Sequence, residues 1–249
     1  MKRNRNLGGC GALAVMLLSG CSSPHGQPQL GSETVAPTEV VDFKSLYADN
    51  CAGCHGSEGK GGPAIGLADP TYLRIADDEA IRQITAKGVP GTSMPAFATS
   101  AGGMLTEGQI DVIVSGIRSR WAKPTILDGA NPPHYAAKST GNVSQGEVAY
   151  GIYCASCHGA SGQGSSKGSA ITNDSFLALI SDRGLRTIVI TGRPEFGAPD
   201  WRGNVPGRPM SDQEITDVVA WLASRRVQTP GQPYSASYNA RQQEPKNVE

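Results

Sequence analysis

Two stretches of the chain repeat the spacing of an amphipathic helix, with apolar side chains three or four positions apart. Each stretch is preceded by a pair that fits a capping box, Thr106 with Gln109 and Ser211 with Glu214. We therefore expect a well-defined helix after each pair. The apolar positions are Ile110, Ile113, Val114, Ile117 and Trp121 in the first helix, and Ile215, Val218, Val219 and Leu222 in the second.

These helices close the two halves of an internal repeat. DEAIRQI at 78–84 matches DRGLRTI at 182–188, and Gly88-Val89-Pro90 matches Gly192-Arg193-Pro194. The closing helices match after one inserted residue. The pattern predicts in each half an opening helix (near 41–50 and 143–153), a short middle helix, a loop and the closing helix. The expected fold class is all-α.

The first residues of the chain have the pattern of a targeting segment. Basic residues precede an apolar run from Leu7 to Leu18, which is shorter than the roughly 20 residues that a membrane-spanning helix needs. This layout is typical of a secretory signal. Its end, Leu18-Ser19-Gly20-Cys21, resembles the lipobox of bacterial lipoproteins, which implies cleavage before Cys21 and acylation of that cysteine. The alternative is an ordinary signal peptide with an incidental cysteine.

The segments outside the repeat are polar. Residues 21–37 are rich in Ser, Pro, Gln and Gly without apolar periodicity, so we expect a flexible tether after a signal peptide at 1–20. Residues 229–249 predict a disordered tail. The mature protein is then expected to be exported to the periplasmic side and held at a membrane surface by its N-terminal lipid.

Composition narrows the possible functions. Lys and Arg number 22 against 22 Asp and Glu, so the chain lacks the basic excess of a nucleic-acid-binding protein. The chain holds 32 Gly and 17 Pro, and only 6% of its residues are aromatic. Halves of this size with so few large side chains lack the bulk to fill a core. The composition indicates that another group helps to fill it.

The spacing of the cysteines indicates what that group is. Beyond Cys21, the four remaining cysteines lie in two C-x-x-C-H patterns, the attachment signature for c-type haem, in which two thiols bond the porphyrin and the histidine binds iron. A thioredoxin-like pair does not need the following histidine, and a zinc site leaves it unexplained. We therefore predict two covalently attached haem c groups, held by Cys51, Cys54 and His55 and by Cys154, Cys157 and His158.

A second axial ligand for the first haem is expected from the loop after the middle helix. Met94 lies there, in the sequence Gly91-Thr92-Ser93-Met94-Pro95. A thioether opposite histidine raises the reduction potential and suits an electron carrier. The competing Met104 stands beside a predicted helix start, where we expect it to pack in the core.

Both halves resemble class I c-type cytochromes, since signature, ligand loop and closing helix recur in the same order. The resemblance covers about residues 38–123 and 140–228, with 124–139 as a linker stiffened by Pro132-Pro133. It implies two tandem domains, each wrapped around its haem. It also implies that the carbonyl of Pro63 orients His55. The second half has no proline at the comparable place, so the partner of His158 is open.

The second ligand loop departs from the first. Met94 falls opposite Ala198, and Met210 is the only methionine of that half. By elimination we predict Met210 as the second axial ligand of the second haem. The alternatives are a packing role for Met210, His134 of the linker as ligand, and an iron with an open sixth position.

The motifs favour electron transfer over bond-making catalysis, because they include no nucleophile–base pair and no nucleotide-binding fingerprint. The chain resembles dihaem c-type subunits attached to quinol-oxidising complexes and haem–copper oxidases, as a tethered carrier or a fixed subunit. One rival is the cytochrome subunit of a dehydrogenase. Another is a dihaem enzyme of the peroxidase or thiosulfate-oxidising type. Arg193, Arg202 and Arg208 flank the second ligand loop and suggest a docking site for an acidic redox partner.

Overall fold

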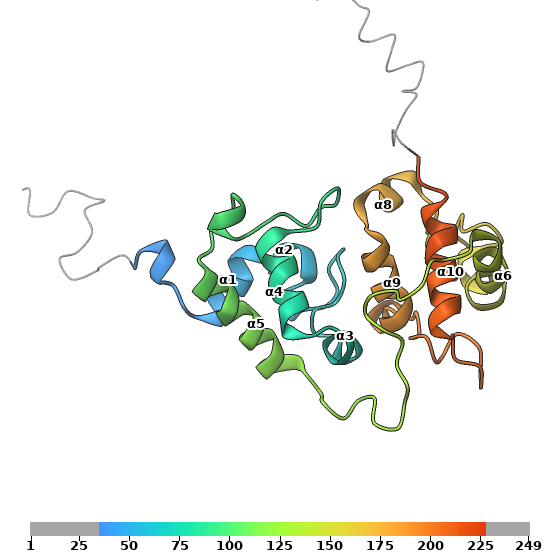
Figure 1. The fold of residues 1–249 in the computed structure, drawn as a ribbon, viewed down its shortest axis with the longest axis horizontal. Helices are drawn as coiled ribbons and strands as arrows, with labels where there is room; N and C mark the ends of the chain where they lie inside the picture. Colours follow the sequence, from blue (N-terminus) through green and yellow to red (C-terminus); the bar gives the residue numbers. More distant parts are fainter. Residues whose placement is uncertain (1–34, 228–249) are drawn as a thin grey trace, which may run out of the picture. The chain divides into compact units, whose positions relative to one another are not determined.

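A computed structural model describes residues 35–227 (Figure 1). The predicted signal peptide at 1–20, Cys21, residues 21–34 of the tether, and the chain from 228 on, including the tail at 229–249, lie outside the described residues. From Thr38 onward the described residues belong to one compact unit. No helix among them is both long and apolar enough to cross a bilayer.

Within residues 35–227 the regular elements are helices, with two isolated β-bridges, so the expected all-α class is confirmed. The first half contains η1 (Pro37–Glu39), α1 (Phe43–Asn50), α2 (Ala52–His55), α3 (Pro70–Ile75), α4 (Asp78–Lys87), η2 (Thr99–Ala101) and α5 (Glu107–Trp121). The second half repeats this order with α6 (Val143–Tyr153), α7 (Ala155–His158), α8 (Asp174–Leu179), α9 (Asp182–Thr191), η3 (Pro194–Phe196) and α10 (Asp212–Ala223).

The predicted helix starts are confirmed by their caps. Thr106 and Ser211 each form the full capping box at the start of α5 and α10. The opening helix α6 has the expected bounds, whereas α1 begins two residues later than expected, after the N-cap Asp42. Helices α3 and α8 are not apparent from the sequence pattern, because each has only six residues and shows too little of a helical period.

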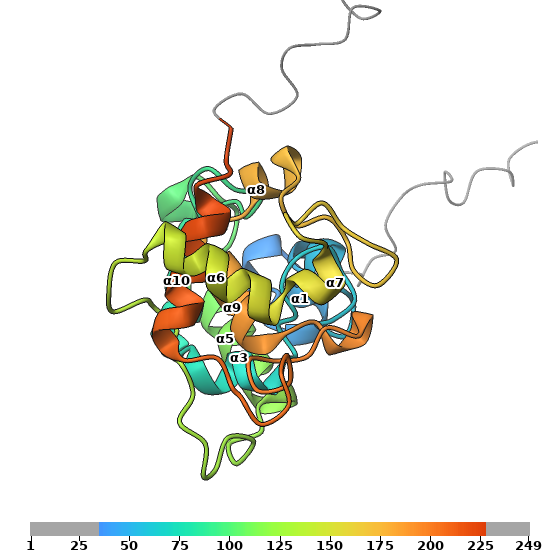
Figure 2. The same ribbon diagram turned by 90° about the vertical axis from the view of Figure 1, so that its right-hand side faces the viewer.

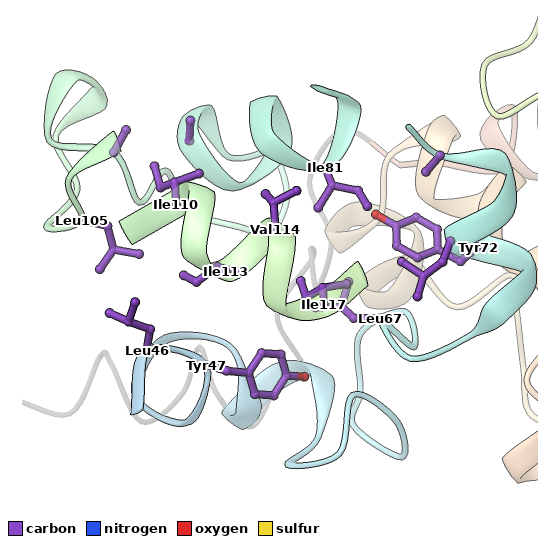
Figure 3. Packing of buried hydrophobic residues seen from close by; sticks show 14 residues of the cluster. Leu46, Tyr47, Leu67, Tyr72, Ile81, Leu105, Ile110, Ile113, Val114 and Ile117 are labelled. Carbon is purple, nitrogen blue, oxygen red and sulfur yellow. The ribbon is translucent and has the colours of Figure 1, made fainter. Parts of the chain in front are cut away.

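Each half has its own hydrophobic core. In the first, α5 packs against both α1 and α4. Figure 3 shows Ile110 and Val114 on the side of α5 that faces α4, and Ile113 on the side toward α1. Ile113 is almost fully buried, as is its neighbour on the next turn, Ile117. The spacing that predicted the helix therefore also marks its buried positions.

The opening and closing helices cross most closely in the second half (Figure 2). Gly146 of α6 lies directly beneath the backbone of α10, where an added Cβ would stand 2.0 Å from the carbonyl oxygen of Asp217. That contact involves backbone atoms and cannot be relieved by rotating a side chain. Gly146 therefore sets how closely the two helices approach. Gly151, on the same helix, faces open space.

The two halves touch through several elements. Helix α3 contacts α9, and Ile75 of α3 packs against the second core. The Nη2 atom of Arg193 donates a hydrogen bond of 2.8 Å to the carbonyl of Gly62 in the first half. The linker is packed as well, since Leu127 is buried in the second core and Tyr135 packs against the first. These contacts hold the halves adjacent.

The helix crossing yields a stability prediction. We expect Gly146→Ala to lower the free energy of unfolding of the holoprotein by roughly 1–3 kcal/mol, because the methyl group overpacks against backbone. Gly151→Ala is the matched control on α6 and should raise it by about 0.5–1 kcal/mol, since alanine favours helix and meets no neighbour. Denaturant titration measures both. Equal effects of the two substitutions would contradict this account of the crossing.

Candidate haem sites

The cysteines and the histidine of each C-x-x-C-H pattern lie on a single helical turn. Cys51 ends α1 and begins α2, so that Cys54 and His55 follow at helical spacings of three and four residues. Side chains at these spacings share one face of a helix. Cys154, Cys157 and His158 have the same arrangement at the junction of α6 and α7. None of these four cysteines is joined in a disulfide.

The imidazole of the first C-x-x-C-H pattern is held by a backbone carbonyl. The Nδ1 atom of His55 lies 2.8 Å from the carbonyl oxygen of Ile65. The expectation that Pro63 supplies this carbonyl is wrong: the loop reaches two residues further before its backbone turns toward the ring. With Nδ1 as the donor, Nε2 keeps a free electron pair for a metal. Burial lowers the pKa of His55, which favours this neutral form.

The second imidazole is held in the same way, which answers how His158 is oriented without a proline. Its Nδ1 lies 2.8 Å from the carbonyl oxygen of Ser169. The sequence offered no signal for this partner, because any residue can supply a backbone carbonyl. The two histidines differ in solvent exposure, since His55 is buried and His158 is only partly buried.

A tyrosine fixes the turn that leaves each signature. Tyr47 donates a hydrogen bond of 2.9 Å to the carbonyl of Gly56, and Tyr150 donates one of 2.5 Å to that of Gly159. Both glycines have positive φ values, 83° and 82°. A Cβ on Gly56 would lie 1.9 Å from the carbonyl oxygen of Lys60. This turn requires glycine, and it sends the chain back toward the imidazole.

The thiols differ in exposure within each pair. Cys51 and Cys154 are partly buried, whereas Cys54 and Cys157 are exposed. Burial, reinforced by the neighbouring cysteine, raises the pKa of Cys51 to about 11 and that of Cys154 to about 12. These thiols are therefore protonated at neutral pH, and they are not poised as thiolate ligands or redox nucleophiles.

The donor set of each half therefore fits haem c, with two thiols and an imidazole that a backbone carbonyl orients through Nδ1. Among residues 35–227, no three His, Cys, Asp or Glu side chains converge as a metal-ion site would require. The zinc alternative thus lacks its ligands in that part of the chain. When bound, haem supplies reversible one-electron chemistry at iron.

The first ligand loop is fixed around Met94. The Val89 N–H donates a hydrogen bond of 2.9 Å to the Met94 carbonyl, and the Met94 N–H donates to Thr92 Oγ1 at 3.2 Å. Met94 itself is partly buried. The expected packing role of Met104 is wrong, because its side chain is 81% exposed. Leu105, one residue later, takes the buried position before α5.

The remaining candidates lie in the second half. Met210 is only 2% exposed and belongs to the second core, where Asn204 Nδ2 lies 4.0 Å from its sulfur. His134 lies beside α10, with its Nδ1 3.5 Å from a carboxylate oxygen of Asp212. Its backbone N–H donates a hydrogen bond of 2.8 Å to the same oxygen. Nothing in these contacts joins Met210 or His134 to His158.

The arginines around the second loop each have an acidic partner. Arg193 pairs with Glu195 at 2.7 Å, Arg202 with Asp200 at 2.6 Å, and Arg208 with Glu214 at 3.2 Å. Because each guanidinium is compensated by a carboxylate, the three do not form a positively charged patch. The structure therefore gives no support to the hypothesis that they attract an acidic redox partner.

Comparison with known proteins places these sites in a family. Residues 38–115 and 141–222, well over half of the chain, match the family described as cytochrome c oxidase, cbb3-type, subunit III. The cbb3-type cytochrome c oxidase subunit CcoP of Azospirillum sp. (strain B510) is 34% identical over 132 residues, which are 49% of this chain and 40% of that relative. The cytochrome bc1 complex cytochrome c subunit of Mycobacterium bovis is 23% identical over 193 residues, covering 76% of this chain and 64% of that relative.

A solved structure, the reducing HAO-like protein complex of Kuenenia stuttgartiensis, is 20% identical with a TM-score of 0.45. It covers 78% of this chain and 98% of that one, but a likeness this weak adds nothing to the assignment. The family match coincides with the two helical repeats and with both C-x-x-C-H turns. The chain belongs to the family of cbb3-type cytochrome c oxidase subunit III, as a dihaem c-type cytochrome with two tandem cytochrome c domains.

Proposed function

We propose that this cytochrome passes electrons between respiratory-chain complexes while anchored to a membrane by an N-terminal lipid. The observation that carries the proposal is the duplicated site. Each half presents two thiols on one helical turn with an imidazole oriented by a backbone carbonyl. Such a site holds a one-electron cofactor and offers no nucleophile for group transfer. The names of the relatives, subunits of a cbb3 oxidase and a bc1 complex, agree with a respiratory role.

The ligands that we propose follow from the two sites. Thioether bonds would form at Cys51 and Cys54 in the first half and at Cys154 and Cys157 in the second. The axial imidazoles would be His55 and His158. Met94 would complete the first haem, because the hydrogen bonds of its loop fix its backbone on both sides.

Contact between the halves supports electron passage from one haem to the other. The hydrogen bond from Arg193 to Gly62 joins the second ligand loop to the loop of the first half that runs between His55 and its partner Ile65. Helices α3 and α9 add an apolar contact. A fixed contact between the two binding loops would keep the cofactors at a constant separation, on which the rate of electron transfer depends.

The partner complex is the main experimental question. A fixed subunit of an oxidase or quinol-oxidising complex should co-purify with it from detergent-solubilised membranes, whereas a tethered carrier should separate. A dehydrogenase subunit would co-purify with a dehydrogenase instead. In either respiratory case, quinol added to membranes should reduce both haems, and oxygen should reoxidise them. Membranes in which neither haem responds to quinol or oxygen would contradict a respiratory role.

The first axial methionine can be tested against a matched control. We expect Met94→Ala to abolish the sulfur-to-iron charge-transfer band of one haem and to lower its reduction potential, because a thioether favours the reduced iron. Met104→Leu removes a methionine from the same loop at an exposed position and should leave spectrum and potential unchanged. Optical redox titration measures both. The opposite outcome would assign the ligand to Met104.

The lipid anchor can be tested by a single substitution. We expect Cys21→Ser to move the holoprotein from the membrane fraction to the soluble periplasmic fraction, because the thiol that would carry the acyl chain is lost. Haem content should not change, since both signatures are intact. Cys10→Ser, within the predicted leader, is the control and should leave the protein on the membrane. Retention there of a Cys21→Ser protein from which the leader has been removed would refute lipidation at this site.

A further inference from the structure

The two halves allow a residue-by-residue comparison of their ligand loops. In the first, the N–H of Val89 donates a hydrogen bond of 2.9 Å to the carbonyl of Met94. In the second, the N–H of Arg193 donates one of the same length to the carbonyl of Ala198. The same backbone bond therefore closes both loops, and Ala198 takes the position of Met94.

The glycines that precede these loops confirm the match. Gly88 ends α4 with a φ of 67°, and Gly192 ends α9 with a φ of 69°. A Cβ on Gly88 would lie 2.7 Å from the carbonyl oxygen of Met94, and one on Gly192 would lie 2.6 Å from that of Ala198. Two independent contacts thus give the same correspondence. A methyl side chain has no electron pair to offer a metal, so the second half lacks the thioether at this position.

Met210 corresponds to a different residue of the first half. The N–H of Met210 donates to the carbonyl of Trp201 at 2.9 Å, as that of Leu105 donates to the carbonyl of Phe97 at 2.7 Å. Each stands directly before the N-cap of its closing helix. Leu105 is 5% exposed and Met210 is 2% exposed. The burial of Met210 is therefore explained by a core position that the first half fills with leucine.

The linker histidine, His134, is also held by contacts with other residues. The backbone of His134 is fixed at both ends, since its N–H donates to Asp212 and its carbonyl accepts a hydrogen bond of 2.8 Å from Nε of Arg186. Arg186 is itself buried and bound to Asp212 and to Thr216. This network ties the linker to the start of α10 and directs the imidazole toward Asp212.

We propose that Ala198 leaves the sixth coordination position of the second haem open to a small external ligand, while Met94 closes that of the first. This rests on the proposed attachment of a haem to each half. Trp201, three residues after Ala198, is buried, and the carboxylate of Asp200 between them is paired with Arg202 at 2.6 Å. Because Arg202 compensates the charge of Asp200, the residues after Ala198 leave no free charge for an ionic ligand, so the site would take a small neutral one such as carbon monoxide. The cytochrome would then combine a closed electron-transfer haem with an open one.

Carbon monoxide binding to the reduced holoprotein tests this inference. We expect the wild type to bind one carbon monoxide for every two haems, and its oxidised spectrum to show one high-spin and one low-spin haem. Ala198→Met restores the residue of the first half and should abolish carbon monoxide binding at concentrations that saturate the wild type. Met210→Leu, which also copies the first half, should leave binding and spin state unchanged.

Haem content is measured on every variant by mass and by absorbance of the pyridine complex. It distinguishes a failure of haem attachment from a failure of the open coordination position. A wild type without two attached haems would contradict the proposed function itself. Two attached low-spin haems that bind no carbon monoxide would overturn only the open position. Conversion of a low-spin haem to high spin by Met210→Leu would identify Met210 as the ligand, and the same change in His134→Ala would identify His134. If Ala198→Met fails to mature, the wild-type and Met210→Leu spectra still decide.

Discussion

The hydrogen bond between the imidazole of each C-x-x-C-H pattern and a backbone carbonyl is the contact on which each half depends. It orients His55 through Ile65 and His158 through Ser169, and it requires the chain to leave the signature turn and come back within about ten residues. Gly56 and Gly159 permit that reversal, and a tyrosine from the opening helix anchors each of them. The contact thereby fixes the orientation of each imidazole. The two loops share this geometry although their sequences differ.

The helical framework serves these loops. A closing helix crosses the opening helix in each half, and the opening helix runs directly into the first cysteine. Stability and cofactor binding are therefore linked, because displacement of the opening helix displaces the thiols. Two arginines make similar contacts near the C-terminal ends of the closing helices. Arg118 and Arg226 each bind two backbone carbonyls at the C-terminal end of the short third helix of their half, α3 or α8.

The sequence was most informative where a feature depends on local spacing. The closing helices, both capping boxes and the bounds of α6 follow from periodicity and caps, and the haem signatures from cysteine spacing. It was least informative where backbone atoms make the contact. The carbonyl of Ile65 has no side-chain signature, so a family proline suggested Pro63 instead. The exposure of Met104 depends on which of two adjacent apolar residues turns inward, and the pairing of the arginines depends on how their loop folds.

Because the chain contains a repeat, each half can be compared with the other. Features common to both halves are those that attach and orient a haem, and the difference at Met94 and Ala198 stands out because the surrounding hydrogen bonds are the same. Membership of the family accounts for the shared part, and the chain spans 40% and 64% of the two curated relatives described above. The features that the two halves share would serve the covalent attachment of a haem at each of the two C-x-x-C-H signatures.

Intact-protein mass spectrometry of the exported protein tests that attachment most directly. The account predicts a mature chain that carries two haems and has no free thiol among Cys51, Cys54, Cys154 and Cys157. A variant with serine at Cys154 and Cys157 should carry one haem, still bound to the first half. A chain with all four thiols free, or with its cysteines joined as disulfides, would contradict it.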